Sequence, residues 1–212
     1  MIPQKKAIKG LYAVTPDTAD TALLESKTVA AIKGGARVVQ YRNKTASPAL
    51  RREQARGLLD VCNQLDAILL VNDHVDLAAE IDAHGAHIGG DDGSLKQARA
   101  RLGPDRIIGV SCYKELARAK AAVEGGADYI AFGSFYASSV KPSAVRAPLS
   151  LLTSARAFGV PVVAIGGITP ENAGPLIAAG ADAVAVISAL YAVPDITAAA
   201  KKFCQLFEAN RS

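Results

Sequence analysis

The sequence contains no tryptophan, and aromatic residues make up only 5% of its 212 residues. Cysteine is also scarce. Cys62, Cys112 and Cys204 are odd in number and widely spaced, which argues against a disulfide framework and a CxxC metal site. We therefore expect a reducing, cytoplasmic environment. No apolar run approaches the roughly 20 residues of a membrane-spanning helix, and no apolar segment typical of a signal peptide precedes the first predicted strand.

The charge is modest, with a formal net charge of +4 and a pI near 9.0. Such a balance favours anionic ligands only in a general way. There is no basic tail or stripe of the kind that binds nucleic acid. We therefore expect small-molecule ligands and neither a nucleic-acid nor a membrane partner. A homo-oligomer is compatible with the sequence, which leaves the oligomeric state open.

Half of the residues are hydrophobic, and the shortage of aromatics predicts a core of Ala, Val, Ile and Leu, which suits parallel strands buried on both faces. Short β-branched runs alternate with helical patterns along the whole chain. The predicted strands cover residues 10–16, 37–43, 67–73, 86–90, 106–112, 128–134, 161–167 and 181–188. The clearest helical segments cover residues 21–35, 49–66, 94–103, 114–126 and 195–211.

Eight βα units in one chain predict an α/β fold, a single (β/α)8 TIM barrel over residues 1–212. A six-stranded Rossmann fold would leave two strands over, and no GxGxxG follows the first strand. A weak repeat supports the strand count, because Gly-Ala precedes every second strand. The pairs are Gly35-Ala36, Gly85-Ala86, Gly126-Ala127 and Gly180-Ala181. They indicate either internal duplication or ordinary helix-to-strand turns.

Polar residues concentrate where the predicted strands end, which is the catalytic face of this fold. They are Gln40, Arg42, Asn43, Lys44, Asn72, Asp73, Asp91, Asp92, Ser111, Ser134, Ser138, Ser139, Lys141, Thr169 and Ser188. Asp73 and Asp92 end neighbouring strands, so their carboxylates can converge on Mg²⁺, which takes few protein ligands and fills the rest with water and phosphate. The alternative is that each carboxylate caps the helix that follows it.

Two anion sites are expected above the barrel. Arg42 and Lys44 are two residues apart and point to the same side, and with Lys141 they could neutralise a diphosphate. The alternative is ordinary solvated charge, above all for Lys141. The second site is a cup of backbone amides after the seventh and eighth strands, residues 164–169 and 186–190, where glycine allows close approach of a phosphate.

Histidine and cysteine offer little further chemistry. His74, His84 and His87 do not form an HExxH pattern, and we interpret all three as structural. Cys112 has no nearby histidine in the sequence to activate it, and Cys62 and Cys204 fall on helices as small core residues.

Taken together, seven motifs over nearly the whole chain resemble the thiamine phosphate synthase family. They are VQYRNK (39–44), VND (71–73), HIGGDD (87–92), GVS (109–111), AFGSFYASSVK (131–141), AIGGIT (164–169) and AVISAL (185–190). The resemblance implies a (β/α)8 barrel that joins hydroxymethylpyrimidine diphosphate to thiazole phosphate. The products would be thiamine phosphate and diphosphate, and Mg²⁺ would be required.

The resemblance also implies roles for individual residues. Substrate-binding residues would be Gln40, Tyr41, Arg42, Asn43, Lys44, Asn72, Ser111, Ser138, Ser139, Val140, Lys141, Gly167, Ile187 and Ser188. Arg42, Lys44, Ser111 and Lys141 would act in catalysis, and Asp73 and Asp92 would bind Mg²⁺. The chain departs from the common family pattern at Asn43, Gly90 and Val140, and the last removes one hydroxyl from the thiazole loop.

The expected reaction needs no protein nucleophile. Once cations neutralise the diphosphate it can leave, the aminopyrimidine ring delocalises the charge on the methylene carbon, and the thiazole nitrogen attacks. Two alternatives remain. A related thiazole tautomerase would not need the charged residues, and Tyr113 stands at the position expected for its catalytic histidine. A non-catalytic phosphate-ligand sensor would need an output domain, which the sequence does not show.

Overall fold

Eight parallel strands close into a barrel in a computed structural model that describes residues 8–89, 94–137 and 147–210. The strands are β1 (Gly10–Val14), β2 (Val38–Tyr41), β3 (Ile68–Asn72), β4 (Gly85–Ile88), β5 (Ile107–Tyr113), β6 (Tyr129–Phe132), β7 (Val162–Ile165) and β8 (Ala183–Val186). They follow one another in sequence order, and β1 pairs with β8 to close the ring. The predicted (β/α)8 barrel is confirmed.

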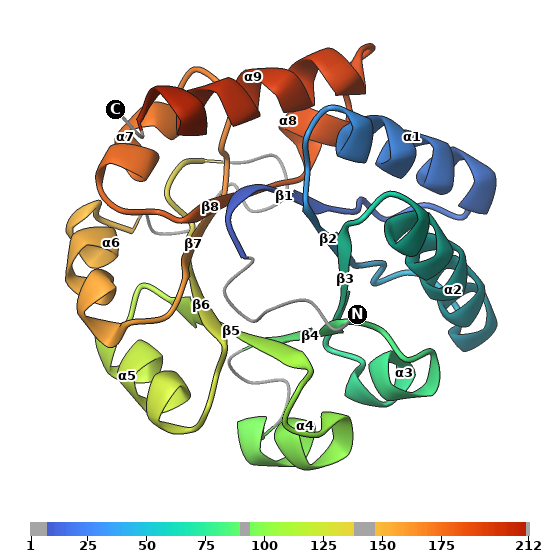
Figure 1. The fold of residues 1–212 in the computed structure, drawn as a ribbon, viewed down its shortest axis with the longest axis horizontal. Coiled ribbons are helices and arrows are strands. Elements are labelled where there is room, and N and C mark those ends of the chain that lie inside the picture. Colours follow the sequence, from blue (N-terminus) through green and yellow to red (C-terminus); the bar gives the residue numbers. More distant parts are fainter. Residues whose placement is uncertain (1–7, 90–93, 138–146, 211–212) are drawn as a thin grey trace.

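Helices surround the barrel on all sides (Figure 1). They are α1 (Thr21–Lys33), α2 (Pro48–Gln64), α3 (Val75–Glu80), α4 (Leu95–Leu102), α5 (Leu116–Glu124), α6 (Ser150–Ala155), η2 (Arg156–Phe158), α7 (Ala173–Ala178), α8 (Ser188–Tyr191) and α9 (Ile196–Ala209). Asp20, Ser47 and Asp195 begin α1, α2 and α9 by accepting a backbone N–H three residues on. Within the described residues, no helix is both long and apolar enough to cross a bilayer.

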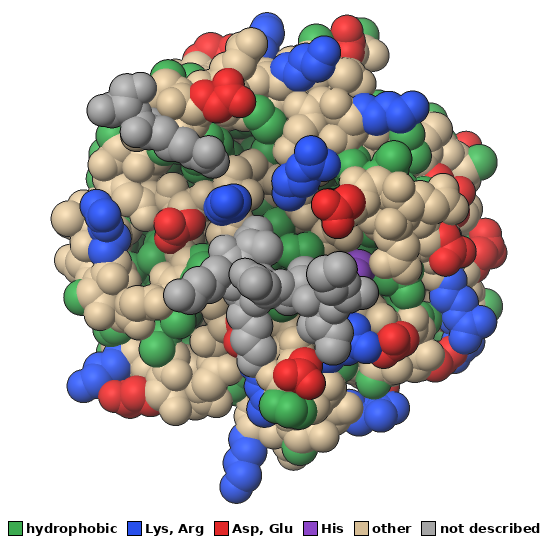
Figure 2. All heavy atoms as spheres, viewed as in Figure 1, with side chains coloured by type: hydrophobic (Ala, Val, Ile, Leu, Met, Phe, Trp, Pro, Cys, Tyr) green, Lys and Arg blue, Asp and Glu red, His purple; other side chains and the backbone are tan. Residues whose placement is uncertain are grey.

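The strand order runs clockwise in Figure 1. For right-handed crossovers, this direction places the N-terminal ends of the strands toward the viewer. Figure 2 therefore shows the N-terminal face, where basic and acidic side chains are interspersed around the rim. The C-terminal ends, where the polar residues were predicted to gather, lie on the opposite face.

Each strand is buried on both sides, as parallel strands inside a ring of helices must be. In β3, Ile68 and Leu70 pack inside the barrel, whereas Leu69 and Val71 pack outward against α2 and α3. Because side chains alternate with a period of two, a shift of the strand register by one residue would turn the inward side chains outward and the outward side chains inward. The same alternation decides below which side chains reach the functional site.

The prediction of a purely aliphatic core is wrong. Four of the six tyrosines are fully buried, namely Tyr12, Tyr41, Tyr129 and Tyr191. Each of their hydroxyl groups hydrogen bonds to another buried side chain. Aromatic residues are few in this chain, but they are concentrated where a phenol can both fill space and place a polar atom in the interior.

The Gly-Ala repeat differs from its sequence pattern at one unit. At five helix-to-strand junctions, a residue with positive φ precedes an alanine whose N–H bonds to the carbonyl five residues back. The pairs are Gly35-Ala36, Asp66-Ala67, Asp82-Ala83, Gly126-Ala127 and Gly180-Ala181. Gly85-Ala86 instead lies inside β4. The device is therefore an ordinary helix end, and it is not confined to every second strand.

Gly126 allows a direct test of this device. A Cβ at this position would meet nothing within 4 Å, and φ is +90°. We expect Gly126→Ala to lower the free energy of unfolding by about 1 kcal/mol through backbone strain alone. Gly126→Asn should lose less, because Asn tolerates the left-handed region. Urea unfolding of both variants checks this, and equal losses would mean that φ does not decide the cost.

Candidate active site

A cavity of about 660 Å³ opens at the C-terminal ends of the strands. Its walls come from all eight strands and the loops that follow them. Nine residues expected at the site from the sequence line it, namely Gln40, Arg42, Lys44, Asn72, Asp73, Ser111, Gly167, Ile187 and Ser188. The structure thus brings together Arg42 and Lys44, one of the two predicted metal carboxylates and the predicted phosphate cup.

Two of the expected substrate-binding residues do not line the cavity. Tyr41 and Asn43 alternate with Gln40 and Arg42, so their side chains lie on the other face of β2. Tyr41 Oη donates to Gln54 Oε1 at 2.9 Å, and Asn43 Nδ2 donates to the same atom at 3.0 Å. Both are buried and hold the β2–α2 connection to α2. Neither side chain is thus directed at the cavity, and a substrate contact of either residue stays a prediction.

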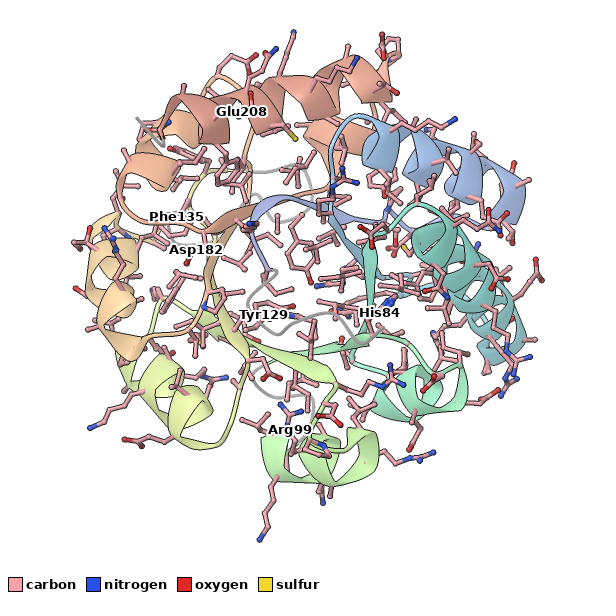
Figure 3. All side chains as sticks on the ribbon, viewed as in Figure 1. His84, Arg99, Tyr129, Phe135, Asp182 and Glu208 are labelled. Carbon is pink, nitrogen blue, oxygen red and sulfur yellow. The ribbon has the colours of Figure 1, made fainter. Side chains whose placement is uncertain are left out.

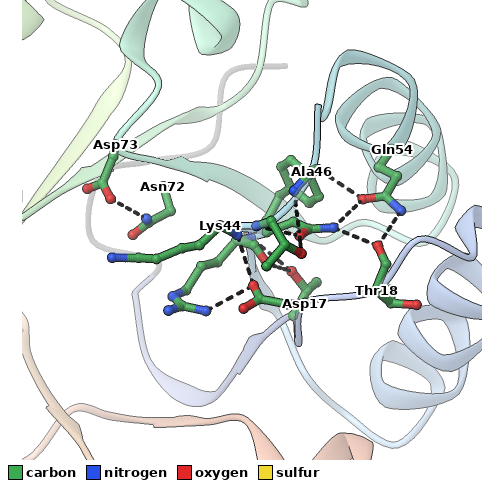
Figure 4. Close-up of polar contacts among 12 residues, drawn as sticks. Asp17, Thr18, Lys44, Ala46, Gln54, Asn72 and Asp73 are labelled. Atoms are coloured by element: carbon green, nitrogen blue, oxygen red, sulfur yellow. Dashed lines mark hydrogen bonds and ion pairs between the residues drawn. The ribbon is translucent and has the colours of Figure 1, made fainter. Parts of the chain in front are cut away.

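Arg42 and Lys44 are positioned by Asp17, a residue that the sequence did not single out. Asp17 Oδ1 accepts from Arg42 Nη1 at 3.2 Å and from the Lys44 backbone N–H at 2.9 Å. Figure 4 shows Asp17 beneath the loop that follows β2 and the Lys44 side chain extending toward Asn72 and Asp73. One carboxylate thus orients the Arg42 guanidinium and fixes the backbone at Lys44, whose ammonium is directed at the cavity.

Asp73 ends β3 with its carboxylate at the cavity wall and its backbone at φ +61°. Its Oδ1 accepts from the Gly89 N–H at 3.1 Å, and its Oδ2 accepts from Asn72 Nδ2 at 2.6 Å. The helix-cap alternative for Asp73 is wrong, because His74 occupies the cap position of α3 and no side chain caps that helix. Each carboxylate oxygen keeps a lone pair available, since the donors above use one on each.

Some expected site residues lie outside the described residues. They are Gly90, Asp91, Asp92, Ser138, Ser139, Val140 and Lys141. Among the residues that are described, no group of three or more His, Cys, Asp or Glu side chains could hold a metal. Asp73 is therefore the one predicted metal ligand whose position the structure gives.

The predicted phosphate cup lies where β7 and β8 end. Gly167, Ile187 and Ser188 line the cavity, and α8 begins at Ser188. Asn172 braces the first loop, because its Nδ2 donates to the Gly167 carbonyl at 3.0 Å and its Oδ1 accepts the Thr169 N–H at 2.8 Å. The loop backbone is thus held in place before any ligand binds.

His87 belongs to the site, which the sequence interpretation missed. It points into the barrel from β4 between the outward Ala86 and Ile88, and its Nε2 lies 2.9 Å from Ser111 Oγ. Burial lowers the pKa of His87 to about 4, so the imidazole is neutral at neutral pH. A polar residue at an inward position of a strand was the signal available in the sequence.

The structural interpretation of His84 and Cys112 fits their surroundings. His84 directly precedes β4 at the N-terminal end of the barrel, where its Nδ1 accepts the Leu69 N–H at 2.9 Å, and it does not line the cavity. Cys112 is buried, and burial raises the pKa of its thiol to about 12. Such a thiol remains protonated at neutral pH and is a poor nucleophile.

The rim beside β5 is formed by Tyr113, Lys114 and Glu115, none of which the sequence analysis assigned to the substrate site. Tyr113 lies at φ +50°, which is unusual for a bulky residue, and the pairing of β5 with β6 is irregular at this point. Its ring lies 5.1 Å from the Arg118 guanidinium. This contact holds an exposed aromatic ring at the mouth of the cavity.

Buried His87 and half-buried His84 predict a loss of stability in acid. Burial lowers the pKa of both His84 and His87, so the unfolded chain binds more protons as pH falls below 6.5. Between pH 6.5 and about 4, the lowered pKa of His87 alone should reduce the free energy of unfolding by about 3 kcal/mol. Urea unfolding at several pH values should show a shallower decline for His87→Gln than for the wild type. Parallel curves would exclude His87 as a cause.

The chain is similar to known proteins over nearly its whole length. Residues 11–190 match the family described as thiamine monophosphate synthase. The thiamine-phosphate synthase of Methylobacillus flagellatus is 54% identical over 200 residues, covering 94% of this chain and 96% of that protein. That of Nitrosospira multiformis is 51% identical, covering 96% and 88%. The structure of thiamine phosphate pyrophosphorylase from Pyrococcus furiosus superposes with a TM-score of 0.84 at 32% identity, covering 97% and 98%.

Proposed function

The chain belongs to the thiamine monophosphate synthase family, and from this premise we propose that it joins hydroxymethylpyrimidine diphosphate to thiazole phosphate. The products are thiamine phosphate and diphosphate. As a member of this family the chain is a transferase. One observation of the structure carries the proposal furthest: a single cavity joins a cationic side, Arg42 and Lys44, to a backbone cup at Gly167 and Ser188. Two anionic substrates require two such places.

The cationic side suits the diphosphate. Arg42 offers a planar fork of N–H donors, and Lys44 adds a compact charge two residues on. Asp17 holds the Arg42 guanidinium and the Lys44 backbone, so the Arg42 side chain loses little freedom when a ligand binds. We assign Arg42, Lys44 and, from the family resemblance, Lys141 to the leaving diphosphate.

Asp73 fits a Mg²⁺ ligand. It presents hard oxygen atoms beside the cationic side, and its neighbours Asn72 and Gly89 hold the carboxylate in one orientation. A site with one or two carboxylates that completes its shell with water and phosphate oxygens is the usual arrangement for Mg²⁺. We propose Asp73 and Asp92 as its ligands. Bound there, Mg²⁺ would add positive charge where negative charge accumulates on the diphosphate.

The second substrate suits the opposite wall. We propose that the backbone around Gly167, Ile187 and Ser188 receives the thiazole phosphate, together with Ser138, Ser139 and Val140. Backbone N–H groups at a loop and a helix start bind phosphate without a charged side chain. The apolar side chains between the two walls, among them Val163, Ile165 and Ala185, give the rings a dry surface.

The chemistry needs few protein groups. Neutralised by Arg42 and Lys44, the diphosphate leaves with the electron pair of its carbon–oxygen bond. The aminopyrimidine ring stabilises the positive charge left on the methylene carbon, and the thiazole nitrogen donates its lone pair to that carbon. We propose that the diphosphate leaves before the thiazole nitrogen attacks, which makes the substitution dissociative. The cavity then acts by holding the two rings in line and excluding water.

The enzyme has three free cysteines, of which Cys62 and Cys112 are buried and Cys204 is partly buried. Reduced thiols are expected in a reducing compartment, and we propose the cytoplasm as its location.

The test is a mixing experiment with purified protein. Thiamine phosphate should form only when both substrates and Mg²⁺ are present, and diphosphate should appear in equal amount. Reactions that lack one substrate or contain excess chelator serve as controls. Product formation from a thiazole tautomer alone, or tight binding of a phosphate ligand without turnover, would support the tautomerase or the sensor instead and refute this assignment.

A further inference from the structure

A chain of hydrogen bonds crosses the inside of the barrel and ends at two residues of the cavity. Gln40 Nε2 donates to Tyr12 Oη at 2.8 Å, and Tyr12 Oη lies 2.8 Å from Tyr129 Oη. Tyr129 Oη lies 2.7 Å from His87 Nδ1, and His87 Nε2 lies 2.9 Å from Ser111 Oγ. The chain links β2, β1, β6, β4 and β5, and Figure 3 places Tyr129 near the middle of the barrel.

The chain is built into the interior. Tyr12 is 1% exposed and Tyr129 is fully buried, while Gln40 and His87 are each 6% exposed. The ring of Tyr129 stacks on His87 with centroids 5.6 Å apart and meets Tyr12 edge to face. Gly109 makes room for it, because a Cβ there would lie 1.9 Å from Tyr129 Cζ. Polar groups buried this deeply stabilise the fold only if each has a partner.

Once the donor of the first hydrogen bond is known, the donor and the acceptor of every following hydrogen bond in the chain are determined. The Gln40 amide nitrogen donates and cannot accept, so the one Tyr12 hydroxyl proton goes to Tyr129. Tyr129 must then give its own proton to His87 Nδ1. The imidazole hydrogen therefore sits on Nε2 and is donated to Ser111 Oγ. Within the described residues, the Ser111 proton and the Gln40 carbonyl oxygen are then left without a partner, and both residues line the cavity.

We propose that Tyr12, Tyr129 and His87 are positioning residues that fix the hydrogen-bond polarity of the two cavity residues at the ends of the chain. Ser111 is thereby held as a donor toward an anionic oxygen of the pyrimidine diphosphate. Gln40 is held as an acceptor toward the amino group of the pyrimidine. The proposal rests on the transferase function above, since it concerns the same substrate.

The polarity matters because the opposite arrangement would work against the reaction. If His87 carried its hydrogen on Nδ1, its Nε2 would take the Ser111 proton, and Ser111 would turn lone pairs toward the diphosphate. A hydrogen bond to a charged oxygen would become a repulsion. Losing one bond to a charged group reduces a rate by about 10-fold to 100-fold.

The test compares two variants that each remove one hydroxyl from the chain. In Tyr12→Phe, the Tyr129 proton still has His87 as its only acceptor, so His87 should keep its hydrogen on Nε2. In Tyr129→Phe, His87 loses the donor that selects this tautomer. Nitrogen NMR of protein labelled at its three histidines, with the His87 signals assigned through His87→Gln, reports the tautomer without any substrate.

We expect Nε2–H in the wild type and in Tyr12→Phe, and a mixture or the Nδ1–H form in Tyr129→Phe. The value of kcat should fall about 10-fold to 100-fold in Tyr129→Phe. Tyr12→Phe, which releases Gln40, should mainly raise KM for the pyrimidine diphosphate. Tyr191→Phe is the matched control, because Tyr191 is equally buried, hydrogen bonds to Thr28 and does not line the cavity. Its kcat should stay within about twofold of the wild type.

Nδ1–H in the wild type would overturn the proposal, and so would the same tautomer and the same fall in kcat in both variants. If Tyr129→Phe does not fold, the tautomer of His87 in the wild type alone decides whether the proposal holds. Because the NMR measurement needs no turnover, a failure of the proposed function leaves it interpretable. The Nε2–H tautomer in a protein that makes no thiamine phosphate would refute only the transferase assignment.

Discussion

An Asp73→Asn variant is expected to lose about 100-fold to 1,000-fold in kcat/KM for the pyrimidine diphosphate, and to need more Mg²⁺ for half-maximal rate. The change removes a carboxylate that lines the same cavity as Arg42 and Lys44. Steady-state kinetics over a range of Mg²⁺ concentrations measures both effects. The rate constant reports charge stabilisation, and the Mg²⁺ dependence reports binding.

Asn is the informative replacement because of the backbone at this position. Asp73 lies at φ +61°, a region that Asn tolerates and that costs alanine about 1–2 kcal/mol. Asn also keeps an oxygen that can accept the Gly89 N–H, so the end of β3 should stay in place. The amide nitrogen takes the place of Oδ2, so the hydrogen bond from Asn72 Nδ2 is lost together with the charge. A fall in activity can then be attributed to these two losses and not to a displaced loop.

Asp76→Asn provides the control. Asp76 lies three residues further on in α3, its side chain is 89% exposed, and it pairs with Arg101. The same change of charge there should alter kcat/KM by no more than about twofold, because exposed pairs contribute little. An Asp73→Asn enzyme with the Mg²⁺ dependence of the wild type would remove Asp73 from the metal site.

The catalytic face could be predicted from the sequence because two local rules suffice. Strand ends in a parallel barrel meet on one face, and side chains alternate along a strand. These rules correctly place Gln40, Arg42 and Lys44 on one wall. Applied more strictly, the alternation would also have excluded Tyr41 and Asn43, and it would have drawn His87 into the cavity.

Contacts between distant strands could not be predicted in this way. Tyr12, Gly109 and Tyr129 lie far apart in the chain. The hydrogen bond between the two tyrosines forms only because the barrel closes and because Gly109 has no side chain in the space of the Tyr129 ring. Asp17 is an acidic loop residue whose role appears only when Arg42 and Lys44 are placed above it. The six-residue helices α3, α6 and α7 are too short for a helical period to identify them.

Gly166 and Gly167 follow β7, and the structure gives a reason for glycine at these positions that differs from the one inferred from the sequence. They were expected to let a phosphate approach the backbone. In the structure the space beside them is already filled by the chain that follows β6. A Cβ on Gly166 would lie 2.0 Å from Ser134 Oγ, and a Cβ on Gly167 would lie 2.3 Å from the Ala137 carbonyl oxygen. The glycines therefore allow two loops to pack together at the cup.

Gly167→Ala is accordingly expected to lower kcat/KM for the thiazole phosphate by about 100-fold. The contact is with backbone atoms of Tyr136 and Ala137, which cannot move aside as a flexible side chain could, and φ is +62°. Either the segment after β6 or the loop braced by Asn172 must shift, and a displacement of about 1 Å is enough for such a loss. Kinetics with each substrate varied in turn should show the larger effect on the thiazole side.

Gly174→Ala separates this effect from the general consequence of adding a methyl group. Gly174 lies in α7, and a Cβ there would meet nothing within 4 Å. In a helix this change should raise the free energy of unfolding by about 0.5–1 kcal/mol and leave the kinetics unchanged. If Gly167→Ala left KM and kcat for the thiazole phosphate unaltered, the cup would not depend on the packing of these two loops. The thiazole phosphate would then have to bind elsewhere in the cavity.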